Sequence, residues 1–323
     1  MSFDVVLRSI FSAVFLASVL RISTPIILAA LGGLITDLSG AINISLEGIM
    51  LVSAFTGVVV SAYTHSTLMG VIVGVLSGIA VAALLGYFAL YLKTNIILAG
   101  TAINILATGG TIFLLYVLTG DKGNSSTLAS GMVPNVNIPL VEKIPFVGTV
   151  ISGHHIFVYI AFVLTALLSL LLYRTRLGTH IRAVGENPVA AASLGIDVRK
   201  TQMIALLISG FLASFGGLTM SMAYLNLFQR EMTAGRGFIG LAAVYLGGRK
   251  PWGTLIAAII FGFADAVSNQ LGSLNIPSQL VQMIPYAVTI LALVIYALRE
   301  QNIKRERQRK FQEQEEKALE GSL

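Results

Sequence analysis

The 323-residue sequence contains no cysteine, which excludes disulfide bonds and thiolate metal sites. Its four histidines form no HExxH motif and no comparable ligand spacing, so we expect no metal site. The motif G-x-x-x-x-G-K-[ST] is also missing, so the chain has no P-loop with which to hydrolyse ATP. The chain is therefore expected not to be an enzyme that hydrolyses ATP by that route.

Charge is scarce as well. Charged residues make up 11% of the chain, hydrophobic residues make up 55%, and the mean hydropathy is +0.84. A typical soluble domain has about 25% charged and about 45–50% apolar residues, so this composition predicts an integral membrane protein. The net charge of +6 does not indicate a nucleic-acid partner, because the basic residues gather in loops and in a tail beside the apolar runs.

The apolar runs predict an all-α, polytopic helical bundle with nine or ten membrane crossings, since about 20 apolar residues cross about 30 Å of hydrocarbon. We expect spans at residues 44–62, 68–92, 96–119, 203–225, 251–272 and 278–298. Residues 1–300 are expected to form one transmembrane domain, followed by a charged cytoplasmic tail over 301–323. The apolar N-terminus is expected to be retained, either as one helix kinked between Arg21 and Pro25 or as two shorter helices.

The distribution of lysine and arginine predicts how these spans are oriented. Residues 174–202 carry five Lys and Arg and residues 299–323 carry seven, whereas residues 120–153 carry two. Both strongly basic segments are therefore expected in the cytoplasm, with the 120–153 loop outside. This arrangement requires the short apolar segment 238–248 to cross as well, although eleven helical residues rise only about 16 Å. We predict a broken helix there, which puts Arg249 at the cytoplasmic face.

The basic loop at 174–202 contains a candidate short helix. Asn187 and Pro188 are typical of a helix start, because an Asn side chain accepts from free backbone N–H groups and Pro gives up a donor that has no partner there. Gly195 is typical of a helix end. The residues between them form about two turns, which are too short to be stable alone in water. We therefore expect either a docking element for a partner or an ordinary loop with a helical kink.

Three segments carry a resemblance to a known family. The sequence RTRLGTHIRAVGENPVAAASLGIDV at 174–198, with SGFLASFGGL after it, resembles the cytoplasmic coupling loop of ABC-importer permeases for branched-chain amino acids, ribose and nucleosides. The sequence GRGFIGLAAVYLGGRKPWGTLIAAIIFG at 235–262 resembles a second characteristic segment of that family. The NISLEG segment at 43–48 is similar to its nucleoside-type members, which are associated with a basic membrane lipoprotein.

The resemblance implies a type II ABC-importer fold and a short coupling helix that seats in a cleft of a cytoplasmic ABC ATPase. The residues implied in this contact are Arg182, Glu186, Asn187, Pro188, Ala190, Ala191, Leu194 and Gly195. We expect Ala190, Ala191 and Leu194 to be buried in the contact, and Arg182 and Arg199 to lie at its rim.

The resemblance also implies partners and a location. A second, related permease is expected to form a heterodimer with this chain, and an extracytoplasmic lipoprotein is expected to deliver the substrate. The chain itself is expected to bind no cofactor, because ATP and Mg bind to the partner ATPase. The expected location is the bacterial cytoplasmic membrane, with several crossings and a cytoplasmic C-terminus.

Polar residues within the apolar runs are candidates for the translocation path, because such residues are costly in lipid. They are Asn43, Glu47, Asn104, Tyr245, Asp265 and Asn269. Asn43 and Glu47 are four residues apart, as are Asp265 and Asn269, so each pair is expected to share one helical face. For Asn104 the alternative is a hydrogen bond between helices. Asp37 is expected in a loop at the membrane surface.

Amide and hydroxyl groups with few fixed charges suit a nucleoside, which is neutral and has one flat apolar part. A pentose asks for the same hydroxyl partners and is an alternative. A branched-chain amino acid would need buried opposite charges or a free helix end. An ion-coupled secondary transporter with Glu47 and Asp265 as its embedded carboxylates is an alternative of another class, as is a channel.

Overall fold

The structure of the chain is a computed structural model that describes residues 12–139, 146–272, 283–294, 296–298 and 301. Three predicted features lie outside the described residues in whole or in part. They are the N-terminal residues before Ser12, the first residues of the last span, and the charged tail after Gln301.

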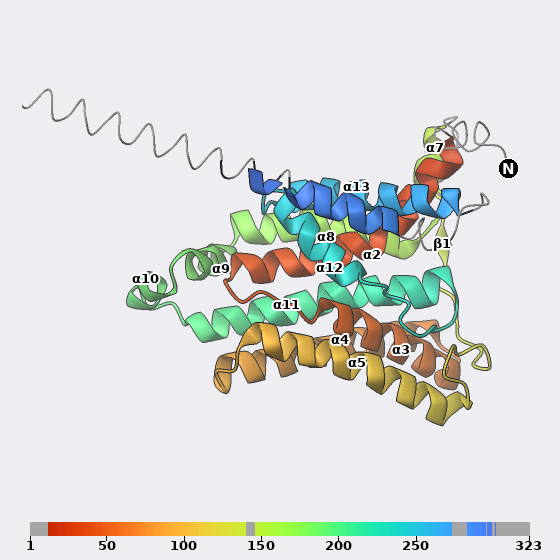
Figure 1. Cartoon of the computed structure of the whole chain (residues 1–323), viewed down its shortest axis with the longest axis horizontal. Coiled ribbons are helices and arrows are strands. Elements are labelled where there is room, and N and C mark those ends of the chain that lie inside the picture. The colour runs from red at the N-terminus through yellow and green to blue at the C-terminus, as the bar shows by residue number, and fades with distance from the viewer. Residues whose placement is uncertain (1–11, 140–145, 273–282, 295, 299–300, 302–323) are drawn as a thin grey trace, which may run out of the picture.

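The described part is almost entirely helical, which confirms the predicted all-α fold (Figure 1). Among the described residues, seven helical segments are long and apolar enough to cross a membrane. They are α2 (Ala13–Leu38), α3 (Leu46–Thr64), α4 (Thr67–Gly86) with the π-helical turn η1 (Tyr87–Tyr91), α5 (Ile96–Thr119), α8 (Ile156–Arg174), α11 (Val198–Leu218) with the π-helical turn η2 (Thr219–Tyr224), and α13 (Pro251–Leu271). The shorter elements are β1 (Asn135–Val136), α7 (Val147–Ile151), β2 (His154–His155), α9 (Arg176–Glu186), α10 (Pro188–Ser193), α12 (Arg236–Leu246) and an apolar helix at Met283–Leu298.

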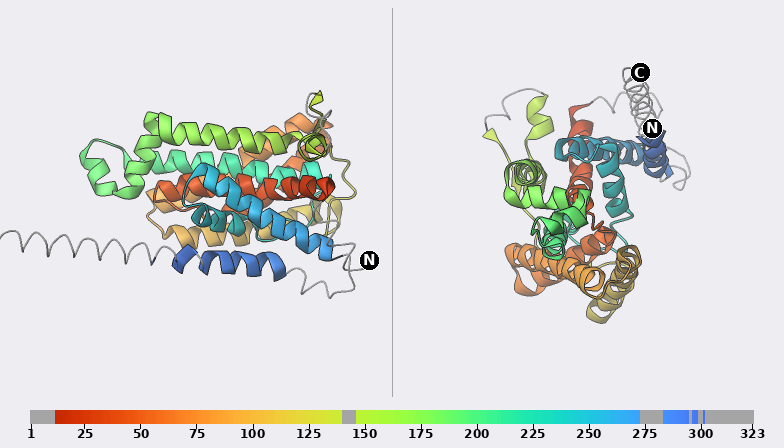
Figure 2. Two further views of the ribbon diagram at one scale, coloured as in Figure 1. Left: turned by 90° about the horizontal axis from the view of Figure 1, so that it is seen from above. Right: turned by 90° about the vertical axis from the view of Figure 1, so that its left-hand side faces the viewer.

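Helix α2 forms the centre of the bundle. All of its side chains from Ser23 to Asp37 are buried, as expected of a helix that is apolar on every side. It packs against α11, α12 and α13. Helices α4 and α5 lie at one edge of the bundle and α13 lies at the other (Figure 1, Figure 2). Pro25 lies within this one helix, so the described residues show a continuous helix where the sequence allowed two.

Glycines on α4 allow the close packing of this helix against α11 and α3. A Cβ atom added at Gly78 would overlap Ser214 Oγ, and one added at Gly74 would lie 2.6 Å from Leu218 Cδ2. Real Cβ atoms essentially never approach other atoms within 3.0 Å. The spacing of small residues on this helix therefore serves helix packing, as such spacing usually does in membrane proteins.

The broken helix predicted from the charge distribution is present as α12 together with the irregular backbone before it. Near one end of the bundle, Ser125 N donates to Phe228 O at 2.9 Å and Phe228 N donates to Ser125 Oγ at 2.8 Å. The chain then runs without regular helix to Arg236, and α12 ends at Leu246 beside the C-terminal end of α2. The 11-residue helix starts two residues earlier than we predicted. Irregular backbone covers the distance that the helix cannot.

The two ends of the bundle carry different elements. Helices α9 and α10 project from one end, whereas β1, β2 and α7 lie at the other (Figure 1). Arg249 follows α12 and lines one cavity together with Arg182 and Glu186 of α9. Arg249 and the 174–202 loop therefore share an end of the bundle, as the charge distribution predicts, and the described part of the 120–153 loop lies at the opposite end.

Candidate functional site

The first turn of α12 is held by a carboxylate from another helix. Glu47 Oε1 accepts a hydrogen bond from Gly235 N at 2.7 Å, and Glu47 Oε2 accepts one from Gly237 N at 2.8 Å. The first N–H groups of a helix have no partner within the helix, and the helix dipole favours a negative charge there. A Cβ atom at Gly237 would lie 2.6 Å from Glu47 N, so only glycine fits this contact. Glu47 therefore fixes the start of α12 against the start of α3.

Arg236 is the first residue of α12 and forms an ion pair with Asp265 of α13. Arg236 Nη2 lies 2.8 Å from Asp265 Oδ2, and the two side chains are 21% and 16% exposed. The eleven residues of α12 rise about 16 Å, which is roughly half of the about 30 Å hydrocarbon thickness. The ion pair therefore lies near mid-depth in the bundle. Charges at that depth face protein or a water-filled path, because exposure to lipid is too costly.

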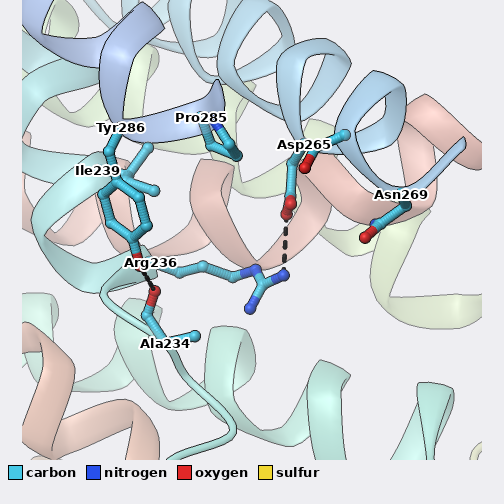
Figure 3. A pocket seen from close by; sticks show the side chains of 8 residues that line it. Ala234, Arg236, Ile239, Asp265, Asn269, Pro285 and Tyr286 are labelled. Atoms are coloured by element: carbon cyan, nitrogen blue, oxygen red, sulfur yellow. Dashed lines mark hydrogen bonds and ion pairs between the residues drawn. The ribbon is translucent and has the colours of Figure 1, made fainter. Parts of the chain in front are cut away.

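The ion pair lines a cavity of ≈ 280 Å³, which is shown in Figure 3. The other lining residues are Ala234, Ile239, Ser268, Asn269, Pro285 and Tyr286. Tyr286 OH donates to Ala234 O at 3.0 Å, which fixes the tyrosine ring at the wall. In Figure 3 the Arg236 side chain extends between this ring and Asp265.

A second cavity of ≈ 520 Å³ adjoins the first, because Ala234, Arg236 and Asn269 line both. Its remaining walls are mostly apolar or aromatic. They include Ile22, Met220, Tyr224, Leu225 and Met232, with Gln229, Arg230 and Glu231 as polar members. The combined space therefore offers flat apolar walls around a small group of polar side chains.

The predicted path residues divide into two groups. Asp265 and Asn269 line the cavities as the sequence suggested, and Glu47 supports α12 beside them. Asn43 is fully buried instead: its Nδ2 donates to Ser209 Oγ at 2.9 Å and its Oδ1 accepts from Ser45 N at 2.9 Å. The prediction that Asn43 and Glu47 share a helical face was wrong, because α3 begins only at Leu46 and Asn43 stabilises the turn before it.

Asn104 joins helices, which was the alternative reading of this residue. Its Oδ1 accepts from Gly48 N at 2.8 Å and its Nδ2 donates to Ile44 O at 2.9 Å. These bonds tie α5 to the start of α3. Within the described part of the chain, Asn104 lines neither of the two adjoining cavities.

Tyr245 lies at the far end of α12, away from the cavities, and it binds Asp37. Tyr245 OH donates to Asp37 Oδ1 at 3.1 Å, and Arg249 Nε lies 2.5 Å from Asp37 Oδ2. The expectation of a surface loop for Asp37 was wrong. Asp37 belongs to the last turn of α2 and is only 6% exposed, because its two partners from α12 and the following turn enclose it.

The end of α2 that carries Asp37 also contacts α9 and α11. Gln202 Nε2 donates to Ser39 O at 3.1 Å, and a Cβ atom at Gly185 would lie 2.8 Å from the carbonyl carbon of Leu38. The end of α2 is therefore packed between α9 and α11 on one side and the end of α12 on the other. The end of α2 therefore connects α9 to the end of α12 through direct contacts.

The short helix predicted in the basic loop is α10. Asn187 Oδ1 accepts from Val189 N at 3.1 Å and from Ala190 N at 3.0 Å, and Gly195 has a left-handed φ of +82° after the helix end. The helix projects from the bundle (Figure 2). Its largest exposed apolar side chains are Val189, which is 75% exposed, and Leu194 at its C-terminal end, which is 81% exposed; Ala190 is exposed as well. Ala191 packs against its own chain with 2% exposed, so the structure gives it a different place from the partner-facing one we expected.

Arg236 and Tyr286 line the first cavity, but neither was predicted from the sequence as a candidate site residue. Arg236 was passed over because it was read only as part of a family segment, although a single arginine inside an apolar stretch is itself a signal. Tyr286 carried no signal that separates it from other tyrosines in apolar spans. Among the described residues, no group of three or more His, Asp or Glu side chains is placed to hold a metal ion.

Comparison with known proteins shows which family has this architecture. A family model described as the permease component of branched-chain amino acid transport systems matches residues 15–293. The chain belongs to this permease family. The matched range includes the α10 loop, α12 and both cavities, so the candidate site lies within the part of the chain that matches the family.

Individual relatives cover most of the permease. It is 33% identical over 298 residues to the nucleoside ABC transporter permease NupC of Lactococcus lactis, covering 88% of this chain and 92% of NupC. It is 33% identical over 293 residues to the guanosine ABC transporter permease NupQ of Bacillus subtilis, covering 87% and 91%. A second Lactococcus lactis permease, NupB, is 29% identical over 140 residues, covering 43% of this chain and 38% of NupB.

A solved structure shares the fold. An ABC transporter of metal-chelate type in an inward-facing conformation matches the permease with a TM-score of 0.50 and 19% identity, covering 85% of this chain and 84% of that one. At this identity the likeness concerns the fold alone. It supports the polytopic helical architecture that the sequence predicts.

Proposed function

We propose that this permease is the membrane-spanning subunit of an ATP-driven importer that takes up nucleosides. The observation that carries the proposal is the 33% identity over about nine-tenths of the chain to two relatives, NupC and NupQ, that are named for nucleoside and guanosine transport. The sequence has no P-loop motif, so in the proposed importer a partner subunit hydrolyses the ATP. ATP and Mg therefore bind to a cytoplasmic ATPase subunit.

The chemistry of the two adjoining cavities supports a nucleoside as the substrate. Arg236 and Asp265 neutralise each other, so the cavities have little net charge to attract an ion. Tyr224, Tyr286 and Met220 provide flat or apolar wall surface, and Asn269 provides an amide. Ligand sites generally combine apolar walls with a few placed polar groups, and a nucleoside has matching parts. We place the translocation path along these cavities.

The partial exposure of the Arg236–Asp265 pair supports a second permease subunit beside this one. A charged pair near mid-depth would be costly against lipid, and a second permease facing this one would enclose the cavities that the pair lines. Lactococcus lactis has two permeases, NupC and NupB, that are both similar to this chain. The proposed assembly is a heterodimer of related permeases with the path between them.

Helix α10 is the proposed contact with the ATPase. Its exposed Val189 and Leu194 would bury apolar surface in a cleft of the partner, and the exposed Arg182 of α9 and Arg199 of α11 would form a charged rim. Asn187 and Pro188 start the helix and Gly195 ends it, so they shape the contact rather than form its centre. Ala191 holds α10 against its own chain.

The proposed location follows from the same orientation. With α10 in the cytoplasm, the loop that carries β1 and β2 faces the outside of the cytoplasmic membrane, where a binding lipoprotein delivers the substrate. The C-terminus is then cytoplasmic, in agreement with its seven Lys and Arg after residue 298.

Deletion of the gene for this permease tests the proposal. We expect uptake of labelled uridine, inosine or guanosine to fall in the deletion strain and to return with a plasmid copy of the permease. Uptake of ribose and leucine is measured in parallel. Unchanged nucleoside uptake together with a loss of ribose or leucine uptake would assign the permease to one of those substrates instead.

A further inference from the structure

The Arg236–Asp265 pair has more hydrogen-bonding capacity than it uses within the described residues. Only Arg236 Nη2 and Asp265 Oδ2 meet at short distance, 2.8 Å. Arg236 Nη1 reaches the carbonyl oxygens of Met232 and Thr233 at 3.5 Å each, which is at the limit for a hydrogen bond. A guanidinium has five N–H donors, and a carboxylate accepts at two oxygens. Within the described residues the pair therefore keeps at least one N–H donor and one carboxylate oxygen without a close partner, and both side chains line the ≈ 280 Å³ cavity.

A donor beside an acceptor is the complement of a nucleobase edge. Uracil and hypoxanthine present a ring N–H next to a carbonyl oxygen, and such an edge would donate to the Asp265 carboxylate while it accepts from the Arg236 guanidinium. In protein–DNA complexes arginine donates to guanine O6 and N7, and aspartate accepts from the cytosine amino group, so each half of such a contact is a known way to bind a base. Asn269 follows Asp265 by one helical turn and lines the same cavity, so its amide extends the polar edge of the site.

The remaining wall suits the face of a base. The Tyr286 ring is 48% exposed, and its hydroxyl is already bound to Ala234 O, so the ring rather than the hydroxyl is offered to a ligand. Ile239 and Pro285 complete this apolar side (Figure 3). Aromatic rings stack with any base because every base has a π-face, whereas a ribose ring has none. The adjoining ≈ 520 Å³ cavity leaves room for the sugar.

We infer that the permease itself binds the nucleobase, with Asp265 and Arg236 on its hydrogen-bonding edge and Tyr286 on its face. This inference rests on the proposed function. It goes beyond that function because it assigns a selective base site to the permease, in addition to any selection by the delivery protein.

The test compares substrates that differ at the base edge or at the sugar. Uridine, 3-methyluridine, which lacks the ring N–H, and 2′-deoxyuridine are supplied to cells that carry the complete importer. The permease is wild type, Asp265→Asn, Arg236→Lys or the exposed-loop control Asp121→Asn. All other subunits stay wild type, so a change in the ratio between substrates arises in the permease. The same substrates are also added to the purified complex without its binding protein, and the rise in its melting temperature is measured.

For the wild type and for Asp121→Asn we expect uridine to be favoured over 3-methyluridine. Asp265→Asn should weaken uridine uptake roughly tenfold or more, because a hydrogen bond to a charged group is lost. It should also remove the preference over 3-methyluridine, while the ratio of uridine to 2′-deoxyuridine stays constant. Arg236→Lys keeps the charge but loses the planar fork, and it should give a smaller change in the same direction.

Two results would overturn the inference while the proposed function stands. If Asp265→Asn changes the 2′-deoxyuridine ratio and leaves the 3-methyluridine ratio alone, the pair binds the sugar. If both Asp265→Asn and Arg236→Lys lower the uptake of all three compounds equally, the pair is structural only. If the wild-type importer takes up no nucleoside, the proposed function fails and the inference fails with it.

Discussion

Removal of the Glu47 carboxylate should detach the start of α12. Glu47 accepts hydrogen bonds of 2.7 and 2.8 Å from Gly235 N and Gly237 N. A hydrogen bond to a charged group contributes about 1.5–3 kcal/mol net, so Glu47→Ala should cost about 3–6 kcal/mol. Glu47→Gln keeps the size of the side chain and one acceptor oxygen, but it turns an NH₂ group toward the second N–H. We therefore expect Glu47→Gln to lose at least half of that free energy.

The two variants are purified in detergent, and their unfolding on heating is compared with that of the wild type and of Glu186→Gln. Glu186 is an exposed glutamate on α9, so its replacement controls for the loss of one negative charge. We expect the melting temperature to fall in the order wild type, Glu47→Gln, Glu47→Ala, with Glu186→Gln close to the wild type. Nucleoside uptake should fall from the wild type to Glu47→Gln to Glu47→Ala, because the cavity wall moves when α12 does. Glu186→Gln is a control for stability alone, because Glu186 is implied in the ATPase contact. A Glu47→Gln protein as stable as Glu186→Gln would refute this role of Glu47.

Four further results are expected. Asp37→Ala should lower the free energy of unfolding by about 1–3 kcal/mol, because it leaves Arg249, which is partly exposed, without its partner. The additional change Arg249→Ala should restore part of the loss. An unchanged unfolding curve for Asp37→Ala would speak against the contact. Leu194→Glu should abolish ATP-driven uptake and leave the amount of permease in the membrane unchanged. Ala191→Glu should reduce that amount, because the Ala191 side chain is buried. Equal behaviour of the two variants would contradict the assignment of faces on α10. Lys250→Cys, made in a chain that has no native cysteine, should not react with an impermeant maleimide added outside intact cells, and labelling from outside would reverse the predicted orientation. Burial, with smaller contributions from His154 and Arg21, lowers the pKa of His155 to about 4, so between about pH 6.5 and 4 the unfolded chain takes up a proton that the folded chain does not. The melting temperature of the wild type should therefore fall as the pH is lowered through this range, and that of His155→Phe should fall less. An equal fall in both would exclude His155 as the cause.

Local signals in the sequence predicted the local structure well. The Asn187–Pro188 start and the Gly195 end of α10 depend only on neighbouring backbone groups, and the structure confirms both within one residue. The count of basic residues in the loops predicted that a short segment must run between the two ends of the bundle, and α12 does so together with the irregular backbone before it. These predictions succeeded because a helix cap or a loop charge acts without regard to distant parts of the chain.

The candidate site could be predicted only in part, because its contacts join residues far apart in the sequence. Glu47 meets Gly235 across 188 positions, and Asp37 meets Arg249 across 212. Composition shows that each polar residue in an apolar run needs a partner, but it does not say which one. Asn43 and Asp265 carried the same signal in the sequence, and yet the first is enclosed in the fold and the second lines a cavity.

We propose that this chain carries nucleosides across a membrane when a partner hydrolyses ATP. The most direct test of this proposal is reconstitution of the complete complex in liposomes, with labelled uridine and the binding protein on one side and ATP with Mg on the ATPase side. We expect uridine to accumulate against its concentration gradient only when ATP is present, and we expect the variant Leu194→Glu to lose this accumulation. Accumulation driven by a sodium or proton gradient without ATP, or accumulation of ribose but not uridine, would contradict it.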